Sequence, residues 1–378
     1  MTELVLKGGR VIDPSQNLDG IADVVFADGR VKAVGRNAAH ARDAEVRDAK
    51  GLIVTPGLID LHTHVYWGGT SLGVDAAALA RTSGTTTFVD AGSSGPGNFH
   101  GFRKHVIEPA PVRILPYLNI SFAGIYAFSA SVMVGECADI RLLDLRECQR
   151  VAEANRDLVV GIKVRVGKGA GGASGVAPLD MALEIAESLG LPVMCHLDFP
   201  PPSRLEVVSR LRKGDVLTHC FRPFPNAPAA ADGSVREEIA AARERGVIFD
   251  IGHGGGSFGF ATARKMLEAG FLPDVISSDV HAVSINGPAF DLLHTMSKFL
   301  VLGVPLATVV QGATSAPAAA IGRKELGTFK AGAVGDATLL EIEEGQFTYH
   351  DVLGEPLKGS KRLASRGIVL GGRWWHPA

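Results

Sequence analysis

The chain has 378 residues, a formal net charge of −2 and 46 glycines. This near-neutral balance gives no electrostatic case for binding nucleic acid or an anionic membrane, and no apolar stretch is long enough to span a bilayer. The chain start lacks the pattern of a signal peptide, and the four cysteines show no C-x-x-C motif and no disulfide-framework spacing. We therefore expect a cytoplasmic α/β protein with reduced thiols.

Both ends of the chain are rich in short β patterns. Residues 4–13 contain two apolar runs around Gly8-Gly9, which predicts a strand, a turn and a second strand. Residues 22–26 and 30–35 flank Asp28-Gly29 and predict a hairpin. Residues 335–342 and 363–370 are also strand-like. Because a small sheet is only marginally stable alone, we expect residues 1–54 and 323–378 to pair into one small β-sandwich domain.

The central part of the chain, residues 55–322, alternates apolar runs with amphipathic helical segments. The predicted strands are 58–64, 86–90, 112–120, 159–166, 192–196, 216–220, 247–251 and 275–279. Helical patterns between them include 179–189, 204–212, 235–245 and 261–269. Eight such units predict an α/β protein built on a (β/α)8 TIM-like barrel, with an open doubly wound sheet as the competing topology.

Potential metal ligands fall at the ends of these predicted strands. His62 and His64 are two residues apart in the first strand, so both imidazoles share one face. The later strands supply Lys163, His196, His219 and Asp279. Each has an ordinary structural explanation, such as a hydrogen-bonded core histidine, a lysine that reaches solvent or a helix-capping aspartate. Their order at the carboxyl ends of a barrel instead indicates one shared site.

That order resembles the amidohydrolase superfamily. The resemblance covers the β-rich N-terminal segment, the Thr-Pro-Gly-Leu-Ile-Asp-Leu-His-Thr-His stretch at residues 55–64, the barrel, and the Gly-Asp-Ala return at 335–337. It implies two divalent metal ions, with His62, His64 and Asp279 on one ion and with His196 and His219 on the other. Lys163, carboxylated by CO2, would bridge them. The family also suggests a homo-oligomer, for which no sequence feature gives evidence.

The chemistry of these residues is consistent with that assignment. Burial lowers the pKa of a lysine amine, which frees it to form a carbamate with two anionic oxygens. Imidazole and carboxylate ligands without thiolate favour zinc, with manganese or iron as alternatives. A metal-bridging hydroxide would attack a carbonyl group, and Asp279 would pass the proton to the leaving group.

Several residues narrow the expected reaction. Lys163 argues against aminopurine deaminases, which usually lack it. Dihydroorotases typically carry Arg where this chain has Tyr66, and show Asp-x-Ala-Pro-His where it has Asp279-Val280-His281-Ala282. Residues 196–201, 218–221, 249–258 and 295–300 resemble a subgroup often labelled dihydroorotase or adenine deaminase.

This subgroup implies a deacetylase or esterase. The expected substrate is an acyl ester or amide of a small carboxylate-bearing compound, such as an acetylated α-hydroxy or α-amino acid. A dihydroorotase-like cyclic amide hydrolase and an aminopurine deaminase remain alternatives. A catalytically inactive barrel that serves as a binding or assembly scaffold is the non-enzymatic alternative, although all six expected ligands are present.

A small anionic substrate requires a cation near the metal ions. Arg165 is the first choice, because it lies one side-chain period beyond Lys163 on the inward face. The alternative is that Arg165 pairs with a structural carboxylate. Arg222, Tyr66, Asn286 and His253 are weaker candidates for substrate binding. Residues 167–172 match G-x-G-x-x-G, but no helical pattern begins directly after them, so we expect a barrel loop rather than a dinucleotide site.

Overall fold

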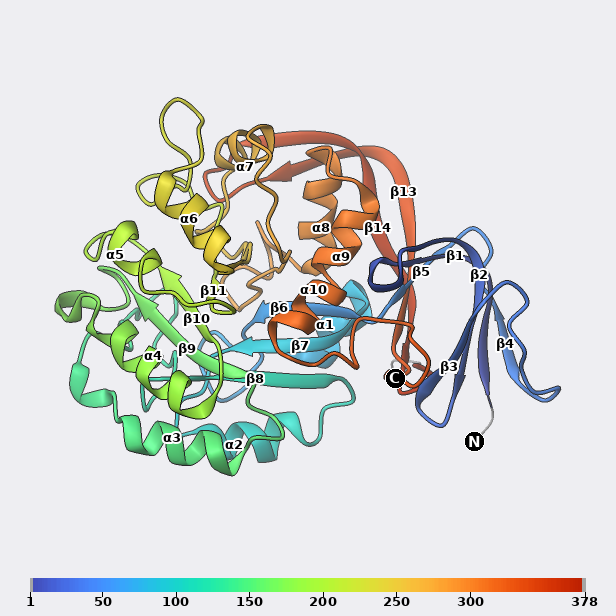
Figure 1. Cartoon of the computed structure of the whole chain (residues 1–378), viewed down its shortest axis with the longest axis horizontal. Helices are drawn as coiled ribbons and strands as arrows, with labels where there is room; N and C mark the ends of the chain where they lie inside the picture. Colours follow the sequence, from blue (N-terminus) through green and yellow to red (C-terminus); the bar gives the residue numbers. More distant parts are fainter. Residues whose placement is uncertain (1–2, 376–378) are drawn as a thin grey trace.

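The computed structural model describes residues 3–375, so the predicted domain limits at residues 1 and 378 fall outside the described part. Two sheets organise the molecule (Figure 1). The first contains strands from both ends of the chain: β1 (Leu4–Asp13), β2 (Leu18–Ala27), β3 (Arg30–Gly35), β4 (Glu45–Asp48), β5 (Ile53–Pro56), β13 (Ala337–His350), β14 (Pro356–Leu370) and β15 (Arg373–Trp375). Antiparallel pairing of β5 with β13 joins the two ends, as the sequence predicts. The inner boundaries of this domain, at residues 54 and 323, stay a prediction.

The terminal segments form one sheet rather than the two separate sheets of a sandwich. Its strand order is β15-β14-β13-β5-β1-β2-β3, and β4 pairs with β1. Apolar residues from both ends of this sheet, including Leu6, Phe26, Leu339 and Val369, share one buried cluster. The two ends of a single sheet therefore enclose the core that a second sheet would otherwise supply.

Two predicted turns have different outcomes. The turn at Gly8-Gly9 is wrong, because β1 is continuous and the register against β2 shifts between Leu6 and Gly9. Gly8 has φ 73°, so it absorbs an irregularity within the strand instead of ending it. The Asp28-Gly29 hairpin is confirmed, with φ 49° and 79° at the two residues that link β2 to β3.

The second sheet is parallel and carries the candidate site. Its strands are β6 (Leu58–Thr63), β7 (Thr85–Ala91), β8 (Arg113–Asn119), β9 (Gly161–Val166), β10 (Val193–Leu197), β11 (Val216–Leu217) and β12 (Ile248–Phe249). The helices are α1 (Ala76–Ser83), α2 (Phe99–Phe102), α3 (Leu145–Ala154), α4 (Ala177–Leu189), α5 (Arg204–Val208), α6 (Glu237–Arg245), α7 (Phe260–Glu268), α8 (Leu292–Val301), α9 (Leu306–Gly312) and α10 (Ser315–Ala320). The strands follow one another in sequence order, without the reversal that defines a doubly wound sheet.

The predicted eighth strand is present only as an extended connection. Residues 275–280 are not assigned as a strand, but they form isolated parallel bridges on both sides, Asp250 with Val275 and Thr63 with Val280. The Asp279 amide also donates to the His62 carbonyl. Residues 275–280 therefore lie between β12 and β6 and bring the two outer strands of the curled sheet toward each other.

The β13–β14 hairpin ties the two sheets together. Figure 1 shows it running from the terminal sheet across the top of the molecule to α7. At its tip, Asp351 accepts a hydrogen bond from the Phe260 amide, and Glu355 pairs with Arg264 at 2.7 Å. Among residues 3–375, no helix has the length and apolar character needed to cross a membrane.

Candidate metal centre

Two histidines and one aspartate meet where β6 ends. The Nε2 atoms of His62 and His64 lie 3.4 and 3.3 Å from Asp279 Oδ1. One ligand atom from each of the three buried residues lies within 4.8 Å of the other two, a spacing that could hold a metal ion. Asp60 comes before them on the same face, but it accepts hydrogen bonds from the Ser278 amide and hydroxyl. It thus holds the segment that presents Asp279.

The other three predicted ligands surround this group. Lys163, on β9, is fully buried, and its Nζ lies 3.4 Å from His62 Nε2. The ring of His219, which follows β11, is 5.1 Å from the His62 ring and 4.6 Å from that of His196 on β10. The fold therefore brings all six residues to one place, while their assignment as ligands of two ions stays a prediction.

Hydrogen bonds at Nδ1 orient the imidazoles of His62 and His219. Thr218 donates its hydroxyl proton to Asp250 at 2.7 Å, so the same hydroxyl accepts from His62 Nδ1 at 2.8 Å. His219 Nδ1 donates to the Gly252 carbonyl at 2.6 Å. In both rings Nε2 is left as the unprotonated nitrogen facing the centre, which is the form that binds a metal ion.

The backbone at the site is strained. His219 and Asp279 have φ values of 64° and 47°, a left-handed conformation that costs a non-glycine residue free energy. Gly254, at φ 53°, packs so closely that an added Cβ would overlap Asp279 Oδ2. Strain of this kind persists only where the surrounding structure enforces it, and it is concentrated at functional sites.

Burial sets the charge state of the cluster. Desolvation holds the pKa of His62, His196 and His219 well below 6.5, so these imidazoles are neutral at pH 7. It also lowers the pKa of Lys163 to about 8 and raises that of Asp279 to about 6. Neutral imidazoles, a carboxylate and an amine that deprotonates readily form a donor set suited to divalent cations.

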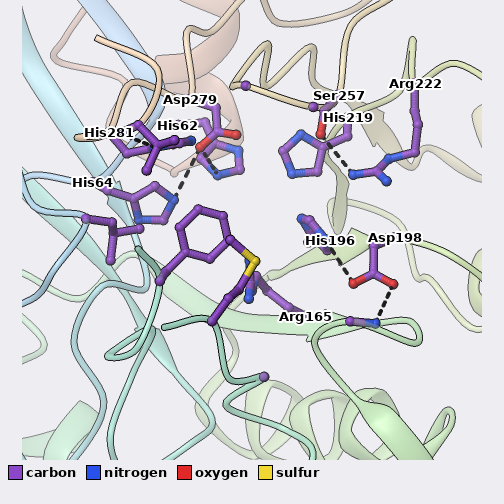
Figure 2. A pocket seen from close by; sticks show the side chains of 18 of the residues that line it. His62, His64, Arg165, His196, Asp198, His219, Arg222, Ser257, Asp279 and His281 are labelled. Carbon is purple, nitrogen blue, oxygen red and sulfur yellow. Dashed lines mark hydrogen bonds and ion pairs between the residues drawn. The ribbon is translucent and has the colours of Figure 1, made fainter. Parts of the chain in front are cut away.

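A cavity of about 670 Å³ opens over these residues. Figure 2 shows His62, His64 and Asp279 on one side and His196, His219 and Arg222 on the other. Apolar side chains complete the walls, namely Leu72, Phe128, Met133, Phe199 and Val283. The arrangement fits a small molecule with both a charged and an apolar part.

The two predicted cavity arginines differ in their partners. Arg165 forms a bidentate pair with Glu136, with Nε and Nη2 at 2.9 and 3.0 Å from the two carboxylate oxygens. The structural pairing that the sequence left open for Arg165 is therefore present. Arg222 donates from Nη2 to Ser257 Oγ at 2.9 Å, and its buried Nε has no hydrogen-bond partner.

The other three substrate candidates lie outside the cavity lining. Tyr66 stacks on Phe102 at 4.5 Å, and its hydroxyl donates to the Asn98 carbonyl. His253 is fully buried, with its ring nitrogens bonded to the Gly254 carbonyl and to Lys298 Nζ. Asn286 is exposed in the loop before α8. The structure thus does not support substrate contacts for Tyr66, His253 or Asn286. The polar atoms of Tyr66 and His253 already have hydrogen-bond partners in the protein, and Asn286 is exposed to solvent.

Two residues that line the cavity, His281 and Asp198, had no role predicted from the sequence. His281 lies 6.1 Å from the His64 ring and lines the cavity, and its place two residues after Asp279 was the available signal. Asp198 also lines it, and its carboxylate accepts hydrogen bonds from the amides of Gly169 and Ala170. The glycine-rich loop at 167–172 therefore binds an anion of the protein itself. The expectation that no helix follows it directly is wrong, because a short 3-10 helix spans Gly172–Ser174 and α4 begins at Ala177, with Pro178 in its first turn.

Comparisons with known proteins agree with this geometry. Residues 53–363 match the Amidohydrolase family. A deacetylase of Brucella anthropi is 35% identical over 357 residues, covering 94% of this chain and 88% of its own length. A deacetylase of Agrobacterium fabrum is 35% identical over 348 residues, covering 92% and 85%.

Solved structures of similar fold also match this chain along almost its whole length. A crystal structure described as a dihydroorotase superposes with a TM-score of 0.89 at 33% identity and covers 99% of both chains. One described as an adenine deaminase has a TM-score of 0.92 at 28% identity, covering 99% of this chain and all of the other. With this extent of similarity along its length, the chain belongs to the amidohydrolase family.

Proposed function

We propose that this protein is a metal-dependent hydrolase that cleaves an acyl ester or amide of a small carboxylate-bearing compound, such as an acetylated α-hydroxy or α-amino acid. The observation that carries the proposal is the convergence of His62, His64 and Asp279 beneath a cavity that also contains cationic side chains. The two relatives named deacetylase support an acyl substrate. We also interpret the parallel sheet and residues 275–280 as a (β/α)8 barrel.

We assign two divalent cations, zinc in preference, to this centre. His62, His64 and Asp279 would hold one, His196 and His219 the other, and a carboxylated Lys163 would contact both. Divalent cations at such a site supply polarisation of a carbonyl oxygen and activation of water. Full burial of Lys163 supports its modification, because it disfavours the ammonium form.

The protein's own groups then handle the proton and the substrate. Asp279, whose Oδ1 lies 3.4 and 3.3 Å from Nε2 of His62 and His64, is the carboxylate that would take a proton and return it to the leaving group. Thr218 and Gly252 keep two imidazoles oriented by accepting their Nδ1 protons. The apolar wall containing Phe128 and Phe199 limits water around the reacting bond.

Metal analysis and a substrate screen test the proposal together. Purified protein should contain or take up two metal equivalents, and should hydrolyse N- or O-acetylated α-hydroxy or α-amino acids of one hand. Lys163→Ala should lose metal and activity, whereas Cys195→Ser, a buried neighbour of His196 on the same strand, is the matched control. Ammonia release from adenine or turnover of dihydroorotate alone would favour those activities, and absence of metal uptake would indicate a scaffold.

A further inference from the structure

The cavity holds two arginines, and only one of them has a counter-ion. Glu136 is buried, the Arg165 side chain is 11% exposed, and the two form two hydrogen bonds, so the positive charge of Arg165 is already balanced. The Arg165 guanidinium also lies 5.2 Å from the Phe128 ring, which helps to fix it against the wall. An incoming carboxylate would have to compete with Glu136 for this group.

Arg222 is in the opposite situation. Its side chain is buried, Nε has no partner, and among residues 3–375 its guanidinium forms no ion pair with a carboxylate. A buried guanidinium without a counter-ion is costly, so its surroundings favour the binding of an anion. Burial accordingly lowers the pKa of Arg222 from its usual value.

Two carboxylates, those of Asp198 and Asp279, attract the Arg222 guanidinium electrostatically. Asp198 accepts hydrogen bonds from the Gly169 and Ala170 amides, and Asp279 lies against His62 and His64. Among residues 3–375, neither carboxylate therefore forms an ion pair with Arg222.

The position of Arg222 suits a substrate group. Its amide donates to the His219 carbonyl, so a short turn places the guanidinium three residues beyond a predicted metal ligand. Figure 2 shows Arg222 and Ser257 beside His219, on the side of the cavity away from His64 and His281. A carboxylate bound there would leave the acyl group of a small substrate directed toward the histidine cluster.

We infer that Arg222, oriented by Ser257, binds the carboxylate of the substrate and gives the enzyme its preference for anionic substrates, whereas Arg165 serves the structure of the cavity wall through Glu136. This inference rests on the proposed hydrolase function and assigns its anion-binding residue. Arginine suits this role because its planar guanidinium can hold both oxygens of a carboxylate.

The test compares an acetylated α-hydroxy acid with its neutral primary carboxamide. In Arg222→Met, kcat/KM for the acid should fall at least about 100-fold further than kcat/KM for the amide, consistent with loss of a charge-assisted contact. Arg222→Lys should recover part of the preference. The matched control is the double variant Arg165→Met/Glu136→Gln, which removes the paired charges together and should change both substrates by similar factors.

Two results would overturn the inference. One is an equal loss for both substrates in Arg222→Met, and the other is a loss selective for the acid in the Arg165/Glu136 double variant. A second measurement separates this question from the reaction itself. If the metal-loaded wild type hydrolyses neither compound, the proposed function fails, and the inference is judged by thermal shift with the free α-hydroxy acid and its amide. The acid should stabilise the wild type and not Arg222→Met, and equal stabilisation of both proteins would refute the role of Arg222.

Discussion

The hydrogen-bond chain behind His62 gives a sharp test of how the candidate centre is organised. Thr218 accepts from His62 Nδ1 at 2.8 Å and donates to Asp250 at 2.7 Å, and Ser277 donates to the other oxygen of Asp250 at 2.6 Å. Thr218→Val keeps the shape of the side chain but removes its hydroxyl. It leaves the Nδ1 proton of His62 without this acceptor in a fully buried position.

The expected magnitude follows from these contacts. A buried donor left without a partner costs about 1–3 kcal/mol. Loss of a group that orients a metal-binding histidine typically weakens metal affinity by about 10–100-fold, or about 1.4–2.7 kcal/mol. We therefore expect Thr218→Val to bind zinc about 10–100-fold more weakly than the wild type and to lose activity at limiting zinc.

The assay is competition for zinc with a chelator of known affinity, together with kcat measured at saturating metal. Thr55→Val is the matched control, because Thr55 is equally buried in the terminal sheet and makes only a 3.4 Å bond to the Thr338 carbonyl. A Thr218→Val protein that binds zinc as tightly as the Thr55→Val protein would refute the argument that Thr218 orients His62.

Three further predictions concern the same region. Gly254→Ala should lower kcat at least about 10-fold and the free energy of unfolding by about 1–2 kcal/mol, because a left-handed residue gains a Cβ that overlaps Asp279 Oδ2. Gly256→Ala is the control and should have little effect on unfolding, because a Cβ there meets nothing within 4 Å. Equal unfolding free energies for the two variants would contradict this. Removal of metal with a chelator should lower the Tm and abolish hydrolysis, and zinc should restore both; an unchanged Tm would argue against a metal bound by the folded state. Burial lowers the pKa of Lys298 from 10.5 to about 7. Between about pH 7 and pH 10.5 the Lys298 amine is therefore protonated in the unfolded chain and neutral in the folded one, so its contribution to stability rises with pH across that range. Urea unfolding of wild type and Lys298→Met at pH 6.5 and pH 9 should show the wild type gaining relative to the variant at the higher pH, and a difference that does not change with pH would contradict the shift.

The sequence alone determined the features that depend on local periodicity. Strand alternation places His62 and His64 on one face, and the succession of apolar runs predicts that Lys163, His196, His219 and Asp279 come to the same end of a parallel sheet. These conclusions hold because side-chain direction in a strand follows from its dihedral angles, whatever the strand packs against.

Only the tertiary structure decided which polar groups are already paired. Glu136, 29 residues before Arg165 and in an irregular connection, neutralises that arginine, and no sequence spacing indicates the contact. His253 similarly forms a hydrogen bond with Lys298, which is 45 residues away in the sequence. Pairing of this kind depends on the approach of distant loops, whose paths are set by the packing of the whole chain rather than by local pattern. Burial then makes each pairing decisive, because a charged group removed from water must find a partner in the protein or in a ligand.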